Sequence, residues 1–162
     1  MNIISDGKEI TLNECQVEGL ARGKEWLKDR SSLFFCLSGS AGTGKTTLCK
    51  ALIDGCYGVV VTAPTHKAKK VIEKSTGRKS LTIHKILGLR PDTQVEEFSP
   101  NNLLFGAQGE GILHEYKICV IDEASMLNVA IVDLIKERAT EWGIKIIFMG
   151  DEMQLPDRKS VV

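Results

Sequence analysis

The sequence lacks an excess of charge of either sign, because 21 basic side chains balance 21 acidic ones over 162 residues. A global positive field is therefore absent, and any contact with nucleic acid has to come from a local basic patch. No apolar run reaches the length of a membrane span, and residues 1–6 lack the layout of a signal peptide. These absences predict a soluble, cytoplasmic protein with no membrane partner.

Cysteine pairs with a recognisable spacing are also lacking. The five cysteines are odd in number and no two are spaced as Cys-x-x-Cys, so neither a disulfide framework nor a zinc site is suggested. Cys36 and Cys119 lie inside apolar segments, and we expect both in the core. Internal repeats are absent, and a hydrophobic content of 43% is sufficient for one core. Residues 1–162 are therefore expected to form a single domain, or part of a larger protein.

The clearest motif that is present runs from Gly39 to Thr47 and reads Gly-x-x-x-x-Gly-Lys-Thr, the pattern of a phosphate-binding loop. The apolar stretch 33–37 before it predicts a buried strand, and residues 47–53 after it predict a helix. Glycines allow such a loop to turn successive N–H groups toward an anion at a helix N-terminus. The residues expected to bind the nucleotide are Gly39, Ser40, Ala41, Gly42, Thr43, Gly44, Lys45, Thr46 and Thr47.

Four side chains have distinct expected roles in this chemistry. Lys45 is placed to reach the β- and γ-phosphates, and the Thr46 hydroxyl is placed to ligate Mg²⁺. A strand predicted at 116–121 ends in two carboxylates, of which Asp122 is expected to hold Mg²⁺ and Glu123 to orient and deprotonate a water. An ordinary acidic turn is the alternative for this pair. Its position after a phosphate loop favours the catalytic interpretation.

The remaining segments alternate between strand and helix patterns. Further strands are predicted at 58–63 and 144–149. Further helices are predicted at 13–28 and at 67–75, and a third follows residues 124–127 and ends at about residue 142. Asn13 is a predicted N-cap, and Gly77 and Gly143 are predicted helix ends. Residues 90–115 are interpreted as an irregular connecting segment, with a small hairpin or a short helix left open. The alternation predicts an α/β fold, with a mostly parallel sheet and helices on both faces.

Other polar residues are ambiguous when taken alone. The amide of Gln16 matches the N6 and N7 edge of adenine, yet an isolated Gln is more typical of a solvated surface. His84 alone is more typical of a structural hydrogen-bonding residue. Basic residues gather around the helix 67–75. Their spacing alone is more typical of a solvated helix face than of a surface that contacts nucleic-acid phosphates. The members of this basic group are Lys67, Lys69, Lys70, Lys74, Arg78 and Lys79.

Six motifs in order give these residues a common context. They are Leu12…Gln16, the loop 39–47, Ala63-Pro64-Thr65-His66-Lys67-Ala68, Thr82-Ile83-His84, Asp122-Glu123-Ala124-Ser125-Met126 and Gly150-Asp151-Glu152-Met153-Gln154-Leu155-Pro156. Together they resemble the adenine-reading motif and motifs I, Ia, Ib, II and III of superfamily 1 DNA helicases. The forms of the last two are similar to the RecD/Dda/Pif1-like branch, superfamily 1B, which typically moves 5′ to 3′. The resemblance implies a RecA-like P-loop NTPase fold.

The resemblance also implies roles for individual residues. Gln16 would contact the adenine of ATP, and Gln154, after the fourth strand, would couple ATP to DNA. A single DNA strand would lie along Pro64, Thr65, His66, Lys67, Thr82 and His84. In the P-loop group that the Asp122-Glu123 pair resembles, the strand 144–149 lies between the strands 33–38 and 117–121.

Members of this family continue into a second RecA-like domain, which supplies arginine fingers and the other half of the DNA channel. This sequence stops soon after Gln154, and its residues after Pro156 depart from the family's usual Gln-Leu-Pro-Pro-Val. Catalytic arginines supplied to a P-loop are worth about 10³ to 10⁵ in rate. We therefore expect this chain alone to bind nucleotide, hydrolyse it very weakly, bind DNA weakly and unwind nothing. A P-loop phosphotransferase and a non-catalytic nucleotide-dependent binding module are the alternatives; Glu123 favours water as the phosphate acceptor.

Overall fold

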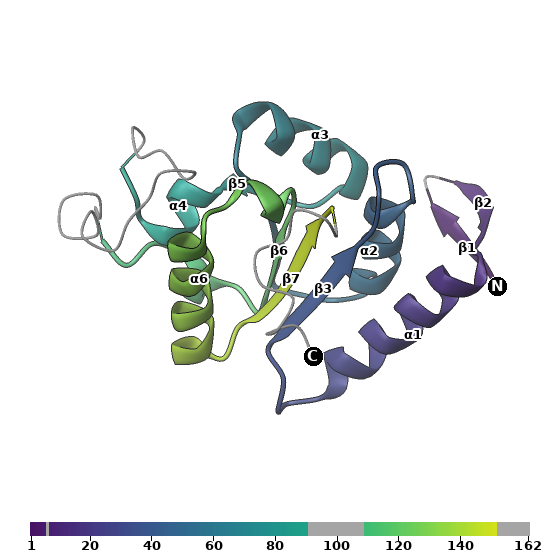
Figure 1. The fold of residues 1–162 in the computed structure, drawn as a ribbon, viewed down its shortest axis with the longest axis horizontal. Coiled ribbons are helices and arrows are strands. Elements are labelled where there is room, and N and C mark those ends of the chain that lie inside the picture. Colours follow the sequence, from purple (N-terminus) through teal and green to yellow (C-terminus); the bar gives the residue numbers. More distant parts are fainter. Residues whose placement is uncertain (6, 91–108, 152–162) are drawn as a thin grey trace.

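The computed structural model describes residues 1–5, 7–90 and 109–151, which contain a five-stranded sheet with helices on both faces (Figure 1). Its neighbouring strands pair in parallel. In spatial order the strands are β3 (Phe34–Ser38), β7 (Lys145–Gly150), β6 (Ile118–Ile121), β4 (Val59–Ala63) and β5 (Ser80–Thr82). The expected α/β fold is confirmed, and β7 lies between β3 and β6 as predicted.

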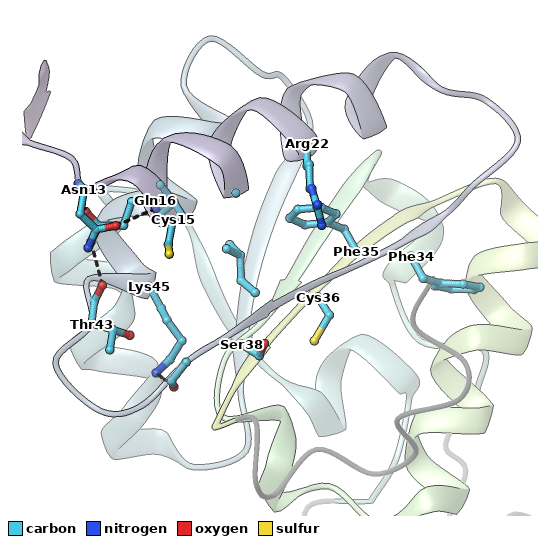
Figure 2. A pocket seen from close by; sticks show the side chains of 14 residues that line it. Asn13, Cys15, Gln16, Arg22, Phe34, Phe35, Cys36, Ser38, Thr43 and Lys45 are labelled. Carbon is cyan, nitrogen blue, oxygen red and sulfur yellow. Dashed lines mark hydrogen bonds between the residues drawn. The ribbon is translucent and has the colours of Figure 1, made fainter. Parts of the chain in front are cut away.

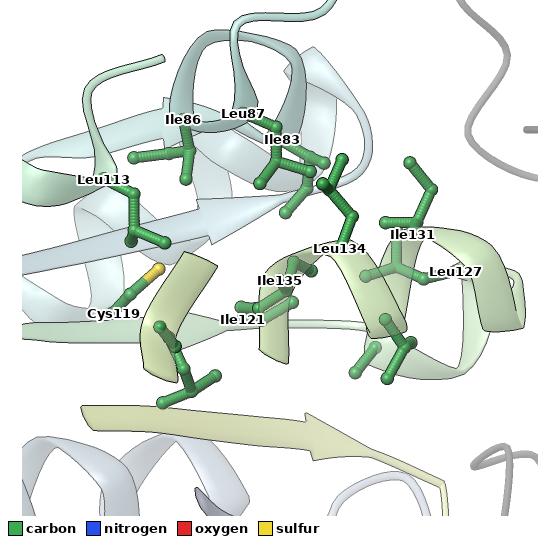
Figure 3. Close-up of a cluster of buried hydrophobic side chains, with 14 of the residues drawn as sticks. Ile83, Ile86, Leu87, Leu113, Cys119, Ile121, Leu127, Ile131, Leu134 and Ile135 are labelled. Carbon is green, nitrogen blue, oxygen red and sulfur yellow. The ribbon is translucent and has the colours of Figure 1, made fainter. Parts of the chain in front are cut away.

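The helices divide the core into two apolar layers, one on each face of the sheet. One layer is covered by α1 (Glu14–Lys28), α2 (Lys45–Ile53) and α3 (His66–Thr76). The other is covered by α4 (Ile83–Leu87) and α6 (Val129–Trp142). Figure 3 shows side chains of α4 and α6 gathered against β6 in this second layer. Both layers anchor the strands whose C-terminal ends carry the candidate site.

The strands and helices end where local sequence signals place them. Asn13 is the N-cap of α1, and Gly77 and Gly143 end α3 and α6 in the left-handed conformation, with φ of 64° and 66°. Cys119 is fully buried on the central strand β6, as expected. Cys36 is only half-buried, because β3 is the edge strand of the described sheet. The prediction of a core position for Cys36 is therefore only partly correct.

A lysine fixes the C-terminal end of α1 to the sheet. The Lys145 ammonium on β7 donates to the carbonyl oxygens of Trp26 at 2.8 Å, Asp29 at 2.6 Å and Ser32 at 2.9 Å. These carbonyls lie at and after the end of the helix, where backbone acceptors have few partners within the helix. The contact therefore holds α1 beside the edge of the sheet.

Smaller elements complete the described chain. Strands β1 (Asn2–Ser5) and β2 (Lys8–Thr11) pair in the antiparallel direction, and β1 packs against α2. Single turns of 3₁₀ helix occur at η2 (Leu113–Glu115) and η3 (Ala124–Met126). Within the segment predicted to be irregular, residues 91–108 lie outside the described residues. Within the described parts, every helix is too short or too polar to span a membrane.

Candidate nucleotide site and nucleic-acid interface

The glycine-rich loop joins β3 to α2 at the C-terminal edge of the sheet. Gly42 and Gly44 adopt φ values of 78° and 81°, which side chains with a Cβ rarely tolerate. Gly44 is also the N-cap of α2 and provides no side-chain cap, so the first N–H groups of that helix have no capping side chain. An uncapped helix N-terminus behind a glycine loop is suited to bind an anion.

Hydrogen bonds close the loop on itself around the carbonyl of Ser40. The Thr43 hydroxyl and the Lys45 ammonium each donate to that carbonyl oxygen at 2.8 Å. Lys45 donates to the Gly39 carbonyl as well. The predicted phosphate-binding lysine therefore lies folded against the loop. A phosphate oxygen would offer it a charged acceptor, which makes a stronger hydrogen bond than a neutral carbonyl.

The two predicted carboxylates follow β6 at the same edge. The Asp122 N–H donates to the Thr62 carbonyl at 2.8 Å, which extends the pairing with β4 by one residue. Burial raises the pKa of the Asp122 carboxyl, and the charge of Glu123 raises it further, whereas Lys45 lowers it. Lys45 begins α2 and Asp122 directly follows β6, so the loop lysine and the strand-end acid lie at the same edge of the sheet.

Glu123 has an unusual backbone conformation. Its φ of 51° is the one positive value among the described non-glycine residues. Such a conformation costs about 1 to 3 kcal/mol and is concentrated at functional sites, where the surrounding structure maintains it. The conformation starts the η3 turn directly after β6, so it decides the direction in which the chain leaves the acid pair.

The residues present fit a magnesium ion that is shared with a nucleotide. Cys49 lies one turn after Thr46 on α2, and its pKa is raised to about 12 by burial and by the charge of Asp122. Thr46 lies in the first turn of α2 and Asp122 directly follows β6, so both lie at the C-terminal edge of the sheet. Among the described residues, no cluster of three potential metal ligands occurs. One hydroxyl and one carboxylate suit Mg²⁺, which takes its other ligands from phosphates and water.

A cavity of about 650 Å³ lies beside the loop, between α1 and β3 (Figure 2). Polar groups of Gln16, Thr43 and Lys45 line one end, and the edge strand, with Phe35 and Leu37, lines the remainder. Gln16 therefore lies beside the phosphate loop. This proximity is not indicated by its position in the sequence. Its amide is already engaged, because it donates to the Thr43 carbonyl and accepts from the Asn13 N–H, each at 2.9 Å.

The predicted DNA-contacting residues follow two adjacent strands. Ala63 at the end of β4 pairs with Thr82 at the end of β5, so the segments 64–67 and 82–84 lie side by side. Thr65 caps α3 by accepting from the Ala68 N–H at 3.1 Å, and Thr82 caps α4. These capping roles were not predicted, although a Thr at the start of a helix pattern signals them. A capping hydroxyl still has its own proton to donate.

The structure separates the basic group that the sequence places together. Lys67 lies in the first turn of α3, at the edge that carries the phosphate loop. Arg78 instead donates to the carbonyls of Ile53 at 3.0 Å and Cys56 at 3.1 Å, at the C-terminal end of α2. Lys79 directly precedes β5, at the opposite edge of the sheet. Arg78 and Lys79 therefore do not share one surface with Lys67.

Gln154 and Pro156 lie outside the described residues, so the predicted contact of Gln154 stays a prediction. The chain is described as far as Asp151, directly after β7. Because β7 lies between β3 and β6, its end emerges between the phosphate loop and the acid pair. In parallel sheets, this edge is where ligands bind.

The fold and this edge of the sheet together define a P-loop NTPase domain. The profile of the AAA domain family matches residues 16–159, and the chain belongs to this family. It is 36% identical over 124 residues to the ATP-dependent DNA helicase dda of Enterobacteria phage T4, a match that covers 74% of this chain and 27% of that protein. It is 33% identical over 124 residues to the ATP-dependent RecD2 DNA helicase of Deinococcus radiodurans, covering 74% of this chain and 16% of that protein.

Solved structures of the same kind are similar. A Bacteroides Pif1 helicase superimposes with a TM-score of 0.64 at 25% identity, over 91% of this chain and 34% of that one. Bacteroides Pif1 bound to ssDNA gives a TM-score of 0.55 at 25% identity, over 93% of this chain and 34% of that one. The resemblance to superfamily 1B helicases is confirmed. The chain spans about a third or less of the length of each of these relatives.

Proposed function

We propose that this chain is the ATP-binding motor domain of a superfamily 1B DNA helicase, coupling ATP hydrolysis to 5′–3′ translocation on single-stranded DNA. The observation that carries the proposal is a shared edge of the sheet. The phosphate loop and the Asp122-Glu123 pair lie on the same edge as the start of α3 and α4. A motor of this kind needs its nucleotide site and its DNA site on one rigid sheet.

ATP would bind with its triphosphate in the loop 39–47. The N–H groups of the glycine-rich loop and of the first turn of α2 would contact the phosphates, and Lys45 would turn to the β- and γ-phosphates. The one unused N–H and the one unused lone pair of the Gln16 amide match the N7 and N6 positions of adenine. The cavity between α1 and β3 has room for the base.

Hydrolysis would depend on the acid pair. Thr46 and Asp122 would hold Mg²⁺, which, when bound, supplies positive charge to the phosphate oxygens. Glu123 would orient a water toward the γ-phosphate and accept its proton. Gln154 would register the γ-phosphate and transmit its presence to the DNA site.

A single strand of DNA would lie across the ends of β4 and β5. The exposed Thr65, His66 and Lys67 at the start of α3 support this placement, since helix N-termini and lysines bind phosphate oxygens. Pro64 is buried and would shape the turn, while Thr82 and His84 would extend the path onto α4. The similar Bacteroides Pif1 binds ssDNA, which supports the same ligand here.

A second RecA-like domain would complete the motor. In its absence, we propose that this chain binds ATP, hydrolyses it slowly and does not unwind DNA, because catalytic arginines from a partner domain are worth about 10³ to 10⁵ in rate. Translocation also requires two domains that close and open around ATP. We place this activity in the cytoplasm.

Substitution of Glu123 tests the proposal against its alternatives. Glu123→Gln is expected to bind ATP like the wild type and to lose hydrolysis by about 10²- to 10⁴-fold, measured as released phosphate. Glu137→Gln, on the exposed face of α6, is the matched control and should leave both quantities unchanged. Unchanged turnover by Glu123→Gln would exclude this residue as the base. Transfer of labelled γ-phosphate to an acceptor other than water would favour a phosphotransferase.

A further inference from the structure

Gln16 connects the start of α1 to the phosphate loop, 27 residues further along the chain. Its Nε2 donates to the Thr43 carbonyl oxygen at 2.9 Å, and its Oε1 accepts from the Asn13 N–H at 2.9 Å (Figure 2). The Gln16 N–H in turn donates to Oδ1 of Asn13 at 2.9 Å, which completes a capping box. The side chain is therefore held at both ends by α1 and by the loop.

The partners of the Gln16 amide determine the positions of its Oε1 and Nε2 atoms. A backbone N–H only donates and a backbone carbonyl only accepts, so the oxygen has to face Asn13 and the NH₂ group has to face Thr43. The reverse orientation would place Oε1 against the Thr43 carbonyl oxygen, which is repulsive. The contact with the loop is therefore a donated hydrogen bond from a pre-oriented group.

Within the described loop, no group donates a hydrogen bond to the Thr43 carbonyl oxygen. The N–H and the hydroxyl of Thr43 both point to the Ser40 carbonyl, at 3.4 and 2.8 Å. The Thr43 carbonyl faces α1, where it accepts a hydrogen bond from the Gln16 amide. A Cβ placed on Gly44 would lie 3.0 Å from Nε2 of Gln16, so the amide also packs closely against that glycine.

The carbonyl of Thr43 and the N–H of Gly44 belong to one planar, trans peptide group. They therefore point in opposite directions, so a carbonyl held toward α1 turns the Gly44 N–H away from α1. Gly44 has a φ of 81°, and glycine readily tolerates the alternative rotation of such a peptide. Rotation would present a carbonyl oxygen to the phosphates in place of an N–H donor.

We propose that Gln16 is a positioning residue for the phosphate loop, which holds the Thr43–Gly44 peptide with its N–H available to the triphosphate. This role is separate from any contact of Gln16 with the base, and it rests on the proposed binding of ATP. One amide would then link both ends of the nucleotide, since it keeps one N–H and one lone pair for the base.

Inorganic tripolyphosphate separates the two roles of Gln16, because it has the phosphates of ATP and no base. Gln16→Met keeps the length of the side chain and removes its donor and acceptor. We expect this variant to bind both tripolyphosphate and ATP about 3- to 10-fold more weakly than the wild type, the loss typical of one hydrogen bond, by calorimetry. A crystal structure of the variant is expected to show the Thr43–Gly44 peptide rotated.

Lys145→Met is the control, because it loosens the other end of α1 without touching Gln16 or the loop. It should lower the melting temperature and leave the affinity for tripolyphosphate unchanged. Weaker ATP binding by Gln16→Met with unchanged tripolyphosphate binding would overturn the inference and leave a base-reading role only. An unrotated peptide in the crystal, or equal losses of tripolyphosphate affinity in Lys145→Met, would overturn it too. A wild-type chain that binds no ATP would contradict the proposed function instead.

Discussion

The Lys145 ammonium lies 4.4 Å from the centroid of the Trp26 ring and 2.8 Å from the carbonyl oxygen of the same residue. One lysine thus makes a cation–π contact and satisfies acceptors at the end of α1. Desolvation by burial lowers the pKa of Lys145, while the nearby Asp29 raises it. Trp26 in turn stacks on Phe35 of β3, with ring centroids 5.3 Å apart. The contact therefore joins α1 to both β7 and β3.

Removal of this lysine should destabilise the domain. We expect Lys145→Met to lower the free energy of unfolding by about 1 to 3 kcal/mol, because three carbonyls lose a charged donor. Urea denaturation measures the loss. Lys28→Met, an exposed lysine in the last turn of the same helix, is the control and should change the free energy by less than about 0.5 kcal/mol. Equal effects of the two substitutions would show that the contacts of Lys145 with the end of α1 contribute nothing.

The raised pKa of Asp122 predicts a pH dependence of stability. In the window between the ordinary value of 3.8 and the raised pKa, the folded protein binds more protons at this carboxyl than the unfolded chain. The free energy of unfolding should therefore fall as the pH rises through this window.

Asp122→Asn removes the ionisation, so the variant should become more stable than the wild type as the pH rises through this window, and it should remain so at neutral pH. Urea denaturation at a series of pH values measures the difference. Asp133→Asn, on an exposed position of α6, controls for a general charge effect. A difference between Asp122→Asn and the wild type that does not grow with pH would contradict the prediction.

Thiol reactivity should distinguish the cysteines. Burial raises the pKa of Cys49 and of Cys119 to about 12, so both thiols stay protonated and enclosed. Cys15 is exposed in the first turn of α1 and lines the cavity beside the loop. We expect a thiol reagent to modify Cys15 much faster than either buried cysteine, and ATP to slow that modification, as followed by mass spectrometry. Native Cys49 reacting as fast as Cys15 would disprove the burial of that thiol.

Salt titration should test the proposed DNA path. Lys67→Ala is expected to weaken binding of single-stranded DNA and to reduce the slope of log affinity against log salt by about 0.7, the value for one phosphate contact. Lys79→Ala makes the same charge change at the opposite edge of the sheet and should leave the slope unchanged. Fluorescence anisotropy with an oligonucleotide at several salt concentrations gives both slopes. Identical slopes for Lys67→Ala and the wild type would remove Lys67 from the path.

Local sequence was sufficient where a feature depends on neighbours along the chain. Asn13, Gly77 and Gly143 were predicted as helix boundaries because capping is decided by a few adjacent residues. The placement of the phosphate loop before α2 was predicted for the same reason. Local sequence did not show how the basic residues are distributed, because α3 carries the chain from one edge of the sheet to the other and takes Arg78 away from Lys67.

The sequence by itself determined the alternation of strands and helices, the glycine loop and the acids at the end of β6, since periodicity and spacing fix these features locally. Only the tertiary structure decided that Gln16 reaches Thr43 and that Lys145 closes the end of α1, across separations of 27 and 119 residues. The physical reason is the order of the strands. The crossover connections that set this order bring α1 beside β3 and β7, and no local pattern along the chain encodes which distant backbone carbonyls a side chain will meet.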